Sequence, residues 1–407
     1  MMKRRDLLKY LSVAPVAGAV AGSVAPFGSL SAAPAAAAKR DLIKELGLRT
    51  FINAYGVYTT HTASLMTDET LDAIKASSRK FVLYNDLQDK VGEKIAAMCH
   101  AEAAMVTSGC WSAIVLGTAG VLTGMDRKKV ALLPNVSSFE KNEVIVQKSH
   151  MGSYDHTLTN TGIIRVVVET AEELEKAITS KTAMTWFYNE AAPWGKIDHA
   201  EWLAIAKKHN VPMMVDIAAD VPPVENLWKF NDMGYDLVCV SGGKAIRGPQ
   251  SAGILMGKKD LIAAARLSAP PGGNNIGRGM KVNKEEILGM YAALERFINL
   301  DHDKEWKMWE DRAQVIADAV NKVKGASAEV FVPPHANVTP TLRIKWDPSQ
   351  IKLESRDMTA NLRNGEPSIE APKYVENALI ISVWMMQDGE EKIVARRLTE
   401  ELKKASV

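Results

Sequence analysis

The chain has 407 residues, enough for two domains and a large buried core. Hydrophobic residues make up 47% and charged residues 24%, which is ordinary for a globular protein and argues against global disorder. The 50 basic and 48 acidic residues are well mixed and give a net charge of +2. Nucleic-acid-binding proteins usually concentrate positive charge, so this balance favours a small-molecule substrate and argues against a nucleic acid.

The first 38 residues differ in composition from the rest of the chain. Arg4 and Arg5 lie in a charged start, residues 10–30 are mostly small and of low polarity, and an alanine-rich stretch ends at Ala38. This order is typical of a signal peptide, and the arginine pair resembles the twin-arginine type. The apolar stretch is too weak for a stable membrane span. We expect cleavage after Ala38 and delivery to the periplasm by the twin-arginine translocase; a plain N-terminal helix is the alternative.

The mature chain is interpreted as an N-terminal segment (39–60), a large domain (61–300) and a small C-terminal domain (301–407). Apolar periodicity predicts, in chain order, helices at 41–47, 67–79, 87–100 and 112–122, a strand at 131–133, a helix at 144–147, a strand at 163–168, a helix at 171–178, a strand at 182–188, a helix at 199–208, strands at 211–215, 236–240 and 252–256, a helix at 283–300, and small-domain strands at 329–332, 341–345 and 380–383. Alternating strands and helices predict a doubly wound α/β fold with a mainly parallel sheet. The short β-branched run at 163–168 is expected to be a buried parallel strand. The C-terminal region is predicted to be a small α+β domain.

Three cysteines lie far apart in the sequence, at Cys99, Cys110 and Cys239. An odd number at wide spacing indicates no disulfide framework, and no Cys/His cluster indicates a metal site. Free cysteine is among the most buried residue types. We therefore expect three buried free thiols and no bound metal.

Lys244 follows a hydrophobic strand and two glycines, in Ser241-Gly-Gly-Lys244. The glycines allow the backbone to approach a ligand closely, and the end of the strand directs the lysine into the crevice of the sheet. A lysine in such surroundings suits a Schiff-base amine of lowered pKa. A phosphate-binding lysine in a glycine loop and a solvated loop lysine are the alternatives.

Asp216 ends another apolar strand, 28 residues before Lys244. One intervening helix and strand can therefore place both side chains at neighbouring strand ends. A pyridoxal 5′-phosphate (PLP) enzyme needs an acid partner for the ring nitrogen, because a protonated ring is the better electron sink. Ala218 is small enough to pack against that ring. Taken alone, Asp216 could equally cap the next helix.

Two further segments fit the same cofactor. Ser108, Gly109 and Cys110 open a predicted buried helix, whose free N–H groups and dipole suit a phosphate, and Ser241 could add a contact. His150, with Tyr154 and His156 behind it, is the candidate for a ring stacked on the cofactor. Both observations have simpler explanations, namely an ordinary helix cap and a structural histidine.

Five motifs occur in an order that resembles a known family: 52–56 (INAYG), 102–109 (EAAMVTSG), 144–156 with His150, 215–223 with Asp216, and 241–250 with Lys244. Together they resemble the fold-type I PLP enzymes related to bacterial selenocysteine synthase, and most of all the D-glucosaminate-6-phosphate ammonia-lyase branch. The resemblance extends from about residue 42 to about residue 402.

This resemblance implies Lys244 as the Schiff-base lysine and Asp216 as the partner of the pyridine nitrogen. It also implies Ser108, Gly109 and Ser241 near the phosphate. Arg278, with Lys281, matches a basic segment that reaches the phosphate across a dimer interface, so a homodimer or higher homo-oligomer is implied.

Some positions depart from the family pattern. Cys110 and Trp111 replace small residues, and Ala371 and Pro372 stand where a basic residue is expected after a Gly-x-Pro-x-Ile loop. The substrate therefore need not be a phosphorylated sugar acid. Fold-type I enzymes commonly bind the substrate carboxylate with a small-domain arginine, for which Arg363 and then Arg343 are the candidates.

The predicted function is α,β-elimination from an amino acid or amino sugar acid, with release of ammonia and a 2-oxo acid. The catalytic residues would be Lys244, Asp216 and His150. A racemase, epimerase or aminotransferase is the first alternative, and a non-catalytic exported binding protein is the second. Selenium transfer to tRNA is disfavoured, because an exported protein would not meet charged tRNA and the chain has no basic RNA-binding extension.

Overall fold

The computed structural model describes residues 40–152, 154–372 and 378–407. The predicted signal peptide, including Arg4 and Arg5, lies outside these ranges. The chain divides into two units, the first ending at Arg49 and the second comprising Thr50–Val407. The described part of the first unit holds the short helix α1 (Leu42–Glu45). In the described residues, no helix combines the length and the apolar character that a membrane crossing requires.

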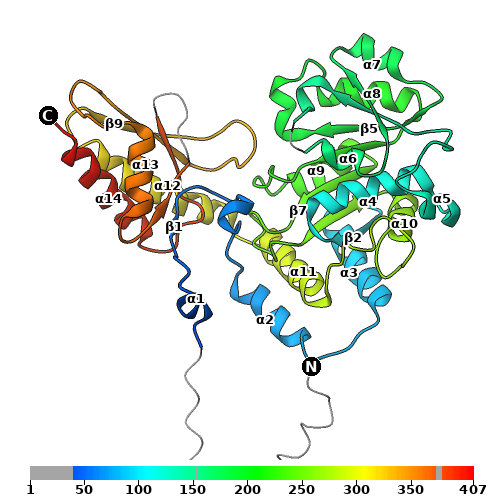
Figure 1. The fold of residues 1–407 in the computed structure, drawn as a ribbon, viewed down its shortest axis with the longest axis horizontal. Helices are drawn as coiled ribbons and strands as arrows, with labels where there is room; N and C mark the ends of the chain where they lie inside the picture. The colour runs from blue at the N-terminus through cyan, green and yellow to red at the C-terminus, as the bar shows by residue number, and fades with distance from the viewer. Residues whose placement is uncertain (1–39, 153, 373–377) are drawn as a thin grey trace, which may run out of the picture. The chain divides into compact units, whose positions relative to one another are not determined.

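A seven-stranded sheet forms the centre of the large domain (Figure 1). Its strands in spatial order are β2 (Ala103–Thr107), β8 (Gly253–Gly257), β7 (Leu237–Ser241), β6 (Met213–Asp216), β5 (Thr182–Tyr188), β3 (Glu143–Gln147) and β4 (Ile164–Val168). All neighbours from β7 to β4 pair in parallel, whereas β8 runs antiparallel to both of its neighbours. The predicted mainly parallel α/β sheet is therefore confirmed.

Helices cover both faces of this sheet. They are α2 (Asp68–Ser77), α3 (Tyr84–Met98), α4 (Gly109–Thr123), α5 (Arg127–Leu132), α6 (His156–Thr159), α7 (Ala171–Ala177), α8 (His199–Lys208), α9 (Asn226–Met233), α10 (Lys259–Leu267) and α11 (Lys284–Ile298). Side chains alternate along each strand: in β7, Val238 and Val240 belong to one apolar core, and Leu237 and Cys239 belong to the other. Both faces are thus buried, as a parallel sheet requires.

Helix starts follow the capping chemistry of the sequence. The Thr67 side chain accepts from Thr70 N at the start of α2, and Asn283 and Glu286 form a capping box at the start of α11. Helix α4 has no side-chain cap of this kind. It is apolar nearly all round and packs between the sheet and α10. The predicted buried helix is confirmed, and it starts directly after β2.

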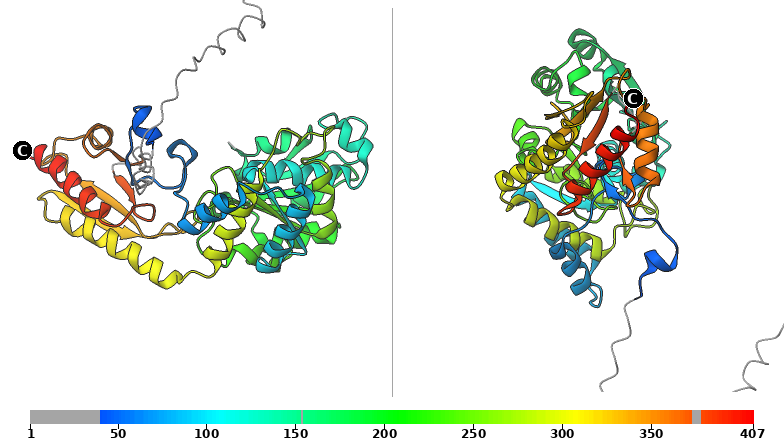
Figure 2. Two further views of the ribbon diagram at one scale, coloured as in Figure 1. Left: turned by 90° about the horizontal axis from the view of Figure 1, so that it is seen from below. Right: turned by 90° about the vertical axis from the view of Figure 1, so that its left-hand side faces the viewer.

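The C-terminal region forms the predicted small α+β domain. Its elements are α12 (His302–Val320), β9 (Ala326–Phe331), β10 (Thr341–Trp346), α13 (Ser355–Asn364), β11 (Ile369–Glu370), β12 (Leu379–Ser382) and α14 (Glu390–Lys404). Strand β10 pairs antiparallel with both β9 and β12, and α12 and α14 lie side by side (Figure 2). Strand β11 pairs in parallel with β1 (Ile52–Asn53). The predicted boundary at residue 300 falls between α11 and α12 and stays a prediction.

Three predictions about individual elements were wrong. Residues 131–133, expected as a strand, end or follow helix α5, because Asp126 caps that helix by accepting from Lys128 N and Lys129 N. Residues 144–147, expected as a helix, form strand β3. This strand pairs with β4 and β5, and its β-branched side chains are buried. Strand β4 was expected to be buried, but it is an edge strand and is mostly exposed.

An aromatic cluster with two histidines lies beside β5. The edge of the Phe187 ring meets His150 at 4.4 Å between centroids, and the His199 ring lies at 4.1 Å. Trp202 of α8 completes the contact at 5.6 Å from Phe187. Burial lowers the pKa of His150 to about 3 and that of His199 to about 4, with nearby positive groups adding to the effect. Both rings are therefore neutral in the folded protein at pH 7.

This burial predicts a loss of stability in mild acid. Because the folded pKa of His150 lies below its unfolded value near 6.5, its contribution is complete above that pH and is lost as the pH falls towards 3. One such proton changes the free energy of unfolding by about 1.4 kcal/mol per pH unit. Urea unfolding of the wild type between about pH 6.5 and pH 5 should show roughly two such protons, because His199 is held neutral in the same way. His150→Gln should flatten it by about one proton, and an unchanged slope would contradict a neutral His150.

Candidate active site

The strands β2, β6 and β7 end on one side of the sheet, where β8 begins, and they place the candidate residues there. Ser241 of β7 is in register with Gly253 of β8, and Gly253 with Thr107 of β2. Asp216 of β6 is in register with Cys239, two residues before the end of β7. Ligand sites of open α/β sheets lie outside the carboxyl ends of the strands. The loops that carry Ser108 and Lys244 therefore leave the sheet on the side where such a site forms.

The backbone around Lys244 is held from several sides. Ser64 Oγ donates to Gly243 O at 2.8 Å, and Arg247 N donates to Lys244 O at 3.0 Å. A Cβ atom at Gly243 would lie 2.4 Å from Gln250 Cα, so only glycine allows the two arms of this loop to approach. Lys244 itself is half-buried. The loop thus presents a single lysine from a fixed backbone.

Asp216 is a buried carboxylate whose charge is only partly compensated. Ala218 N donates to Asp216 Oδ1 at 2.9 Å, and Cys110 Sγ donates to the same oxygen at 3.4 Å. Burial raises the pKa of Asp216, while the Ala218 N–H and the nearby Lys244 lower it. A buried carboxylate is stabilised by a cationic, hydrogen-bonding partner. A protonated pyridine nitrogen is a group of that kind.

The start of α4 forms a narrow cradle beside this pair. A Cβ atom at Gly253 would lie 2.4 Å from Gly109 C and 2.6 Å from Cys110 N. Ser108 Oγ lies 2.9 Å from Ser112 Oγ within the first turn. The N–H groups at the start of a 15-residue helix suit an anion such as a phosphate.

These residues fit PLP. Lys244 would hold the cofactor covalently, Asp216 would pair with its ring nitrogen, and the first turn of α4 would bind its phosphate. The structure brings together the candidates from β2, β6, β7 and the turns that follow them: Ser108, Gly109, Cys110, Asp216, Ala218, Ser241 and Lys244. Their individual roles in binding stay predictions.

His150 is buried and contacts protein groups on several sides. Its side chain is buried, and Tyr188 N donates to its Nδ1 at 3.2 Å. Its Nε2 is 3.3 Å from the amide nitrogen of Gln147, and the edge of Phe187 closes one side of the contact. The structure thus gives His150 a complete set of protein partners, and stacking on the cofactor stays a prediction.

The two predicted small-domain arginines are each paired with a carboxylate of the same domain. Arg363 forms a bidentate ion pair with Glu370, with contacts of 2.8, 3.0 and 2.6 Å. Arg343 pairs with Glu329 at 2.6 Å and lies over the Phe331 ring. To bind a substrate carboxylate, either arginine would have to exchange its carboxylate partner. Arg278 is exposed in the segment between α10 and α11, and its role also stays a prediction.

Sequence reasoning missed several groups around Lys244 and Asp216. Asp220 and Glu190 both act on the electrostatics of this site, and Tyr188 Oη donates to Glu190 Oε2. The pKa of Tyr154 is raised by burial and then by Glu190, Asp216 and Cys110. One signal was available: Glu190 and Asp220 follow the strand ends of β5 and β6 by two and four residues.

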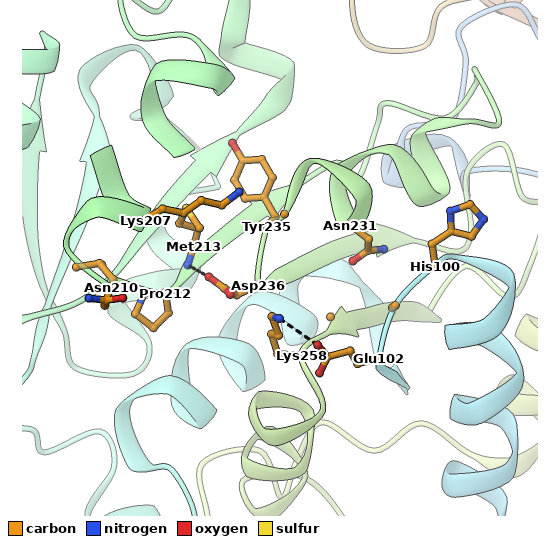
Figure 3. Close-up of a pocket in the computed structure, with 14 residues that line it drawn as sticks. His100, Glu102, Lys207, Asn210, Pro212, Met213, Asn231, Tyr235, Asp236 and Lys258 are labelled. Atoms are coloured by element: carbon orange, nitrogen blue, oxygen red, sulfur yellow. Dashed lines mark hydrogen bonds and ion pairs between the residues drawn. The ribbon is translucent and has the colours of Figure 1, made fainter. Parts of the chain in front are cut away.

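A separate pocket of about 530 Å³ lies at the amino ends of the central parallel strands, on the side of the sheet opposite to Lys244 (Figure 3). It is lined by Met213 and Asp236 at the amino ends of β6 and β7. Its charged groups bond to neighbouring protein groups: Lys258 pairs with Glu102 at 3.0 Å, and Met213 N donates to Asp236 at 2.8 Å. This pocket is therefore distinct from the site around Lys244.

Comparisons with known proteins agree with this geometry. Residues 74–286, about half of the chain, match the aminotransferase class-V family. The D-glucosaminate-6-phosphate ammonia lyase of Salmonella typhimurium is 29% identical over 373 residues, which cover 88% of this chain and 97% of the relative. A solved structure of D-glucosaminate-6-phosphate ammonia-lyase has a TM-score of 0.79 at 27% identity and covers 90% of this chain and 99% of its own.

Two other relatives carry different activities. A Streptomyces 5′-C-glycyluridine monooxygenase-decarboxylase is 26% identical and covers 88% of this chain and 91% of its own. An L-seryl-tRNA(Sec) selenium transferase of Clostridium botulinum is 25% identical and covers 63% of this chain and 58% of its own. The resemblance predicted from the sequence motifs is thereby confirmed. The chain belongs to the class-V aminotransferase family of PLP enzymes.

Proposed function

We propose that this protein is a PLP-dependent ammonia-lyase that acts on a 2-amino-3-hydroxy acid, either an amino acid or an amino sugar acid. The observation that carries the proposal is the convergence of Lys244 and the buried Asp216 at neighbouring strand ends. The likeness to D-glucosaminate-6-phosphate ammonia lyase over most of both chains selects elimination among the reactions open to such a site.

The reaction divides between the cofactor and the residues of the chain. When bound, the cofactor withdraws electrons from the Cα carbon of the substrate amine. Asp216 would hold the ring nitrogen protonated, and its burial would strengthen that pairing. The Lys244 amine would accept the Cα proton at Nζ. The hydroxyl at Cβ then departs as water, and hydrolysis of the resulting enamine yields a 2-oxo acid and ammonia.

A phosphate on the substrate is not required by this proposal. The described side chains that act electrostatically on Lys244 and Asp216 include the carboxyl groups of Glu190 and Asp220. Two carboxyl groups beside the site favour the binding of hydroxyl and amine groups of a substrate, because they repel the like charge of a second phosphate. Unphosphorylated sugar acids and serine therefore belong in the substrate panel beside D-glucosaminate 6-phosphate.

The proposal predicts ammonia and 2-oxo acid in equal amounts. The holoenzyme is assayed with D-glucosaminate, D-glucosaminate 6-phosphate, D-serine and L-serine, and without an amino acceptor. Lys244→Ala should lower the rate by about 10²-fold or more. Borohydride reduction followed by mass spectrometry should place the cofactor on Lys244 in the wild type. Lys258→Ala, which removes a lysine at the opposite edge of the sheet, should leave the rate unchanged.

Other results would select the alternative functions. Exchange between enantiomers without ammonia would indicate a racemase or epimerase, and turnover that needs a 2-oxo acid acceptor would indicate an aminotransferase. If Lys244→Ala changed neither turnover in any assay nor the phenotype of the producing cell, a non-catalytic exported binding protein would replace the enzyme.

We also propose that the chain works as a homodimer or higher homo-oligomer. Arg278 is exposed on the segment between α10 and α11, so in an oligomer it is available to the phosphate of a second copy. The motif that contains Arg278 matches a family segment with that role, and this match supports the proposal.

We further propose that the protein is exported folded by the twin-arginine translocase. PLP is loaded in the cytoplasm, and the twin-arginine pathway carries folded proteins. This pathway could therefore export the protein with its cofactor already bound. The double change Arg4→Lys and Arg5→Lys should retain the protein in the cytoplasm, as judged by immunoblots of cell fractions. Arg40→Lys is the matched control and should be exported. Periplasmic delivery of the doubly changed protein would rule out this pathway.

A further inference from the structure

Asp220 lies on a loop whose backbone is fixed from both domains. Its N–H donates to Ile217 O at 3.1 Å, and its carbonyl accepts from Asn226 Nδ2 at 2.6 Å. The preceding carbonyl, of Ala219, accepts from Asn337 N at 2.8 Å, which links the loop to the small domain. The loop begins at Asp216, so Asp220 is carried on the same rigid turn as the partner of the ring nitrogen.

The Asp220 carboxyl is buried and only half satisfied. Its side chain is 3% exposed, and within the described residues its Oδ2 has no hydrogen-bond partner. The Asn189 side chain bonds to the carboxyl. An unpaired buried polar atom costs free energy, so such an atom beside a substrate site points to a missing ligand group.

Asn189 is itself held in one orientation. His199 Nε2 lies 2.8 Å from Asn189 Oδ1, and Tyr235 Oη lies 2.8 Å from His199 Nδ1. An amide oxygen only accepts, so His199 carries its proton on Nε2 and accepts the Tyr235 hydroxyl at Nδ1. The Asn189 amide nitrogen is therefore left to donate to Asp220. This chain of contacts fixes one oxygen of Asp220 and leaves the other free.

The surroundings keep a proton on Asp220 near neutral pH. Burial raises its pKa to about 7, the charges of Asp216 and Glu190 add to the rise, and Asn189 and Lys244 oppose it. About half of the molecules then hold a neutral acid at pH 7, and a catalytic acid works best when its pKa lies near the operating pH.

We propose that Asp220 is the general acid that protonates the departing Cβ hydroxyl. This inference rests on the proposed elimination and names the residue that completes it. In this step the Cβ–O bond breaks with its electron pair on oxygen, and the proton on the free oxygen of Asp220 moves to that oxygen. Water leaves, and the Asp220 carboxylate regains a proton from solvent. Lys244 removes the Cα proton, so the two proton transfers are separate.

Two neighbouring groups fit this task less well. Glu190 Oε2 accepts the hydrogen bond of Tyr188 Oη, and the Glu190 side chain is less buried than that of Asp220. Burial and Glu190 raise the pKa of Tyr188, which makes its hydroxyl a poor acid. Asp220 differs from both in holding a buried oxygen that has no hydrogen-bond partner among the described residues.

A change of leaving group tests the assignment. Chloride leaves without a proton, so 3-chloroalanine needs no general acid, whereas a hydroxy substrate does. In Asp220→Asn, kcat for the best hydroxy substrate of the panel should fall by about 10²- to 10⁴-fold. The kcat for 3-chloroalanine of the same configuration should change less than about 3-fold, because transition-state proton donation is not involved. Asp220→Glu should restore part of the hydroxy activity.

Two further measurements separate an acid from a structural residue. With the hydroxy substrate, wild-type kcat/KM should fall as the pH rises through about 7, and this decline should be missing with 3-chloroalanine. In infrared difference spectra of the holoenzyme over the same range, the protonated-carboxyl band should disappear with rising pH. It should be missing in Asp220→Asn and present in Asp236→Asn, which removes a half-buried carboxyl at the opposite end of the strands.

The outcomes distinguish this inference from the function on which it rests. If the wild type eliminates both leaving groups and Asp220→Asn slows both equally, or neither, Asp220 is not the acid while the ammonia-lyase stands. If the wild type eliminates neither leaving group, the proposed function fails and the role of Asp220 fails with it.

Discussion

The site depends on one electrostatic constraint, the burial of the Asp216 carboxylate at the end of β6. The energy of an unpaired charge in such a place is high, and the protein supplies one backbone N–H and one thiol against it. Lys244 lies near enough to lower the pKa of Asp216, and a protonated cofactor ring would add a second cation. The same pairing would make the ring a better acceptor of electrons. In the proposed reaction, binding and catalysis would therefore draw on the same ion pair.

Around this pair the chain gathers further carboxyl groups, while Arg343 and Arg363 pair with carboxylates of the small domain. Asp220 and Glu190 differ in their partners: a hydroxyl occupies Glu190, while an amide contacts Asp220 and leaves one of its oxygens free. Neighbouring titratable groups with different environments commonly divide acid and base roles. The neutral imidazole of His199 contacts Asn189 in the core and fixes the orientation of the amide that bonds to Asp220.

Much of the fold could be predicted from the sequence, because strands and helices with one buried face have a clear periodicity. Strand β5 and helix α8 have the predicted bounds, and Lys244 and Asp216 lie at neighbouring strand ends as expected. Short apolar runs such as 144–147 have no clear period, so pairing with neighbouring strands decided their structure. The place of Asp220 after a strand end was visible in the sequence, but its unpaired oxygen was not, because its one side-chain partner, Asn189, is distant in sequence. Likewise, no local pattern shows that Arg363 is paired with Glu370.

The pairing of β1 with β11 has a consequence for the order of folding. Ile52 lies near the start of the described residues, and its partner Ile369 lies more than 300 residues later. Contacts of such long sequence separation form late, because the loop that they close is costly in entropy. During synthesis Ile52 has to wait without its partner until nearly the whole chain has left the ribosome. The native structure is therefore completed only after translation, in whichever compartment holds the finished chain.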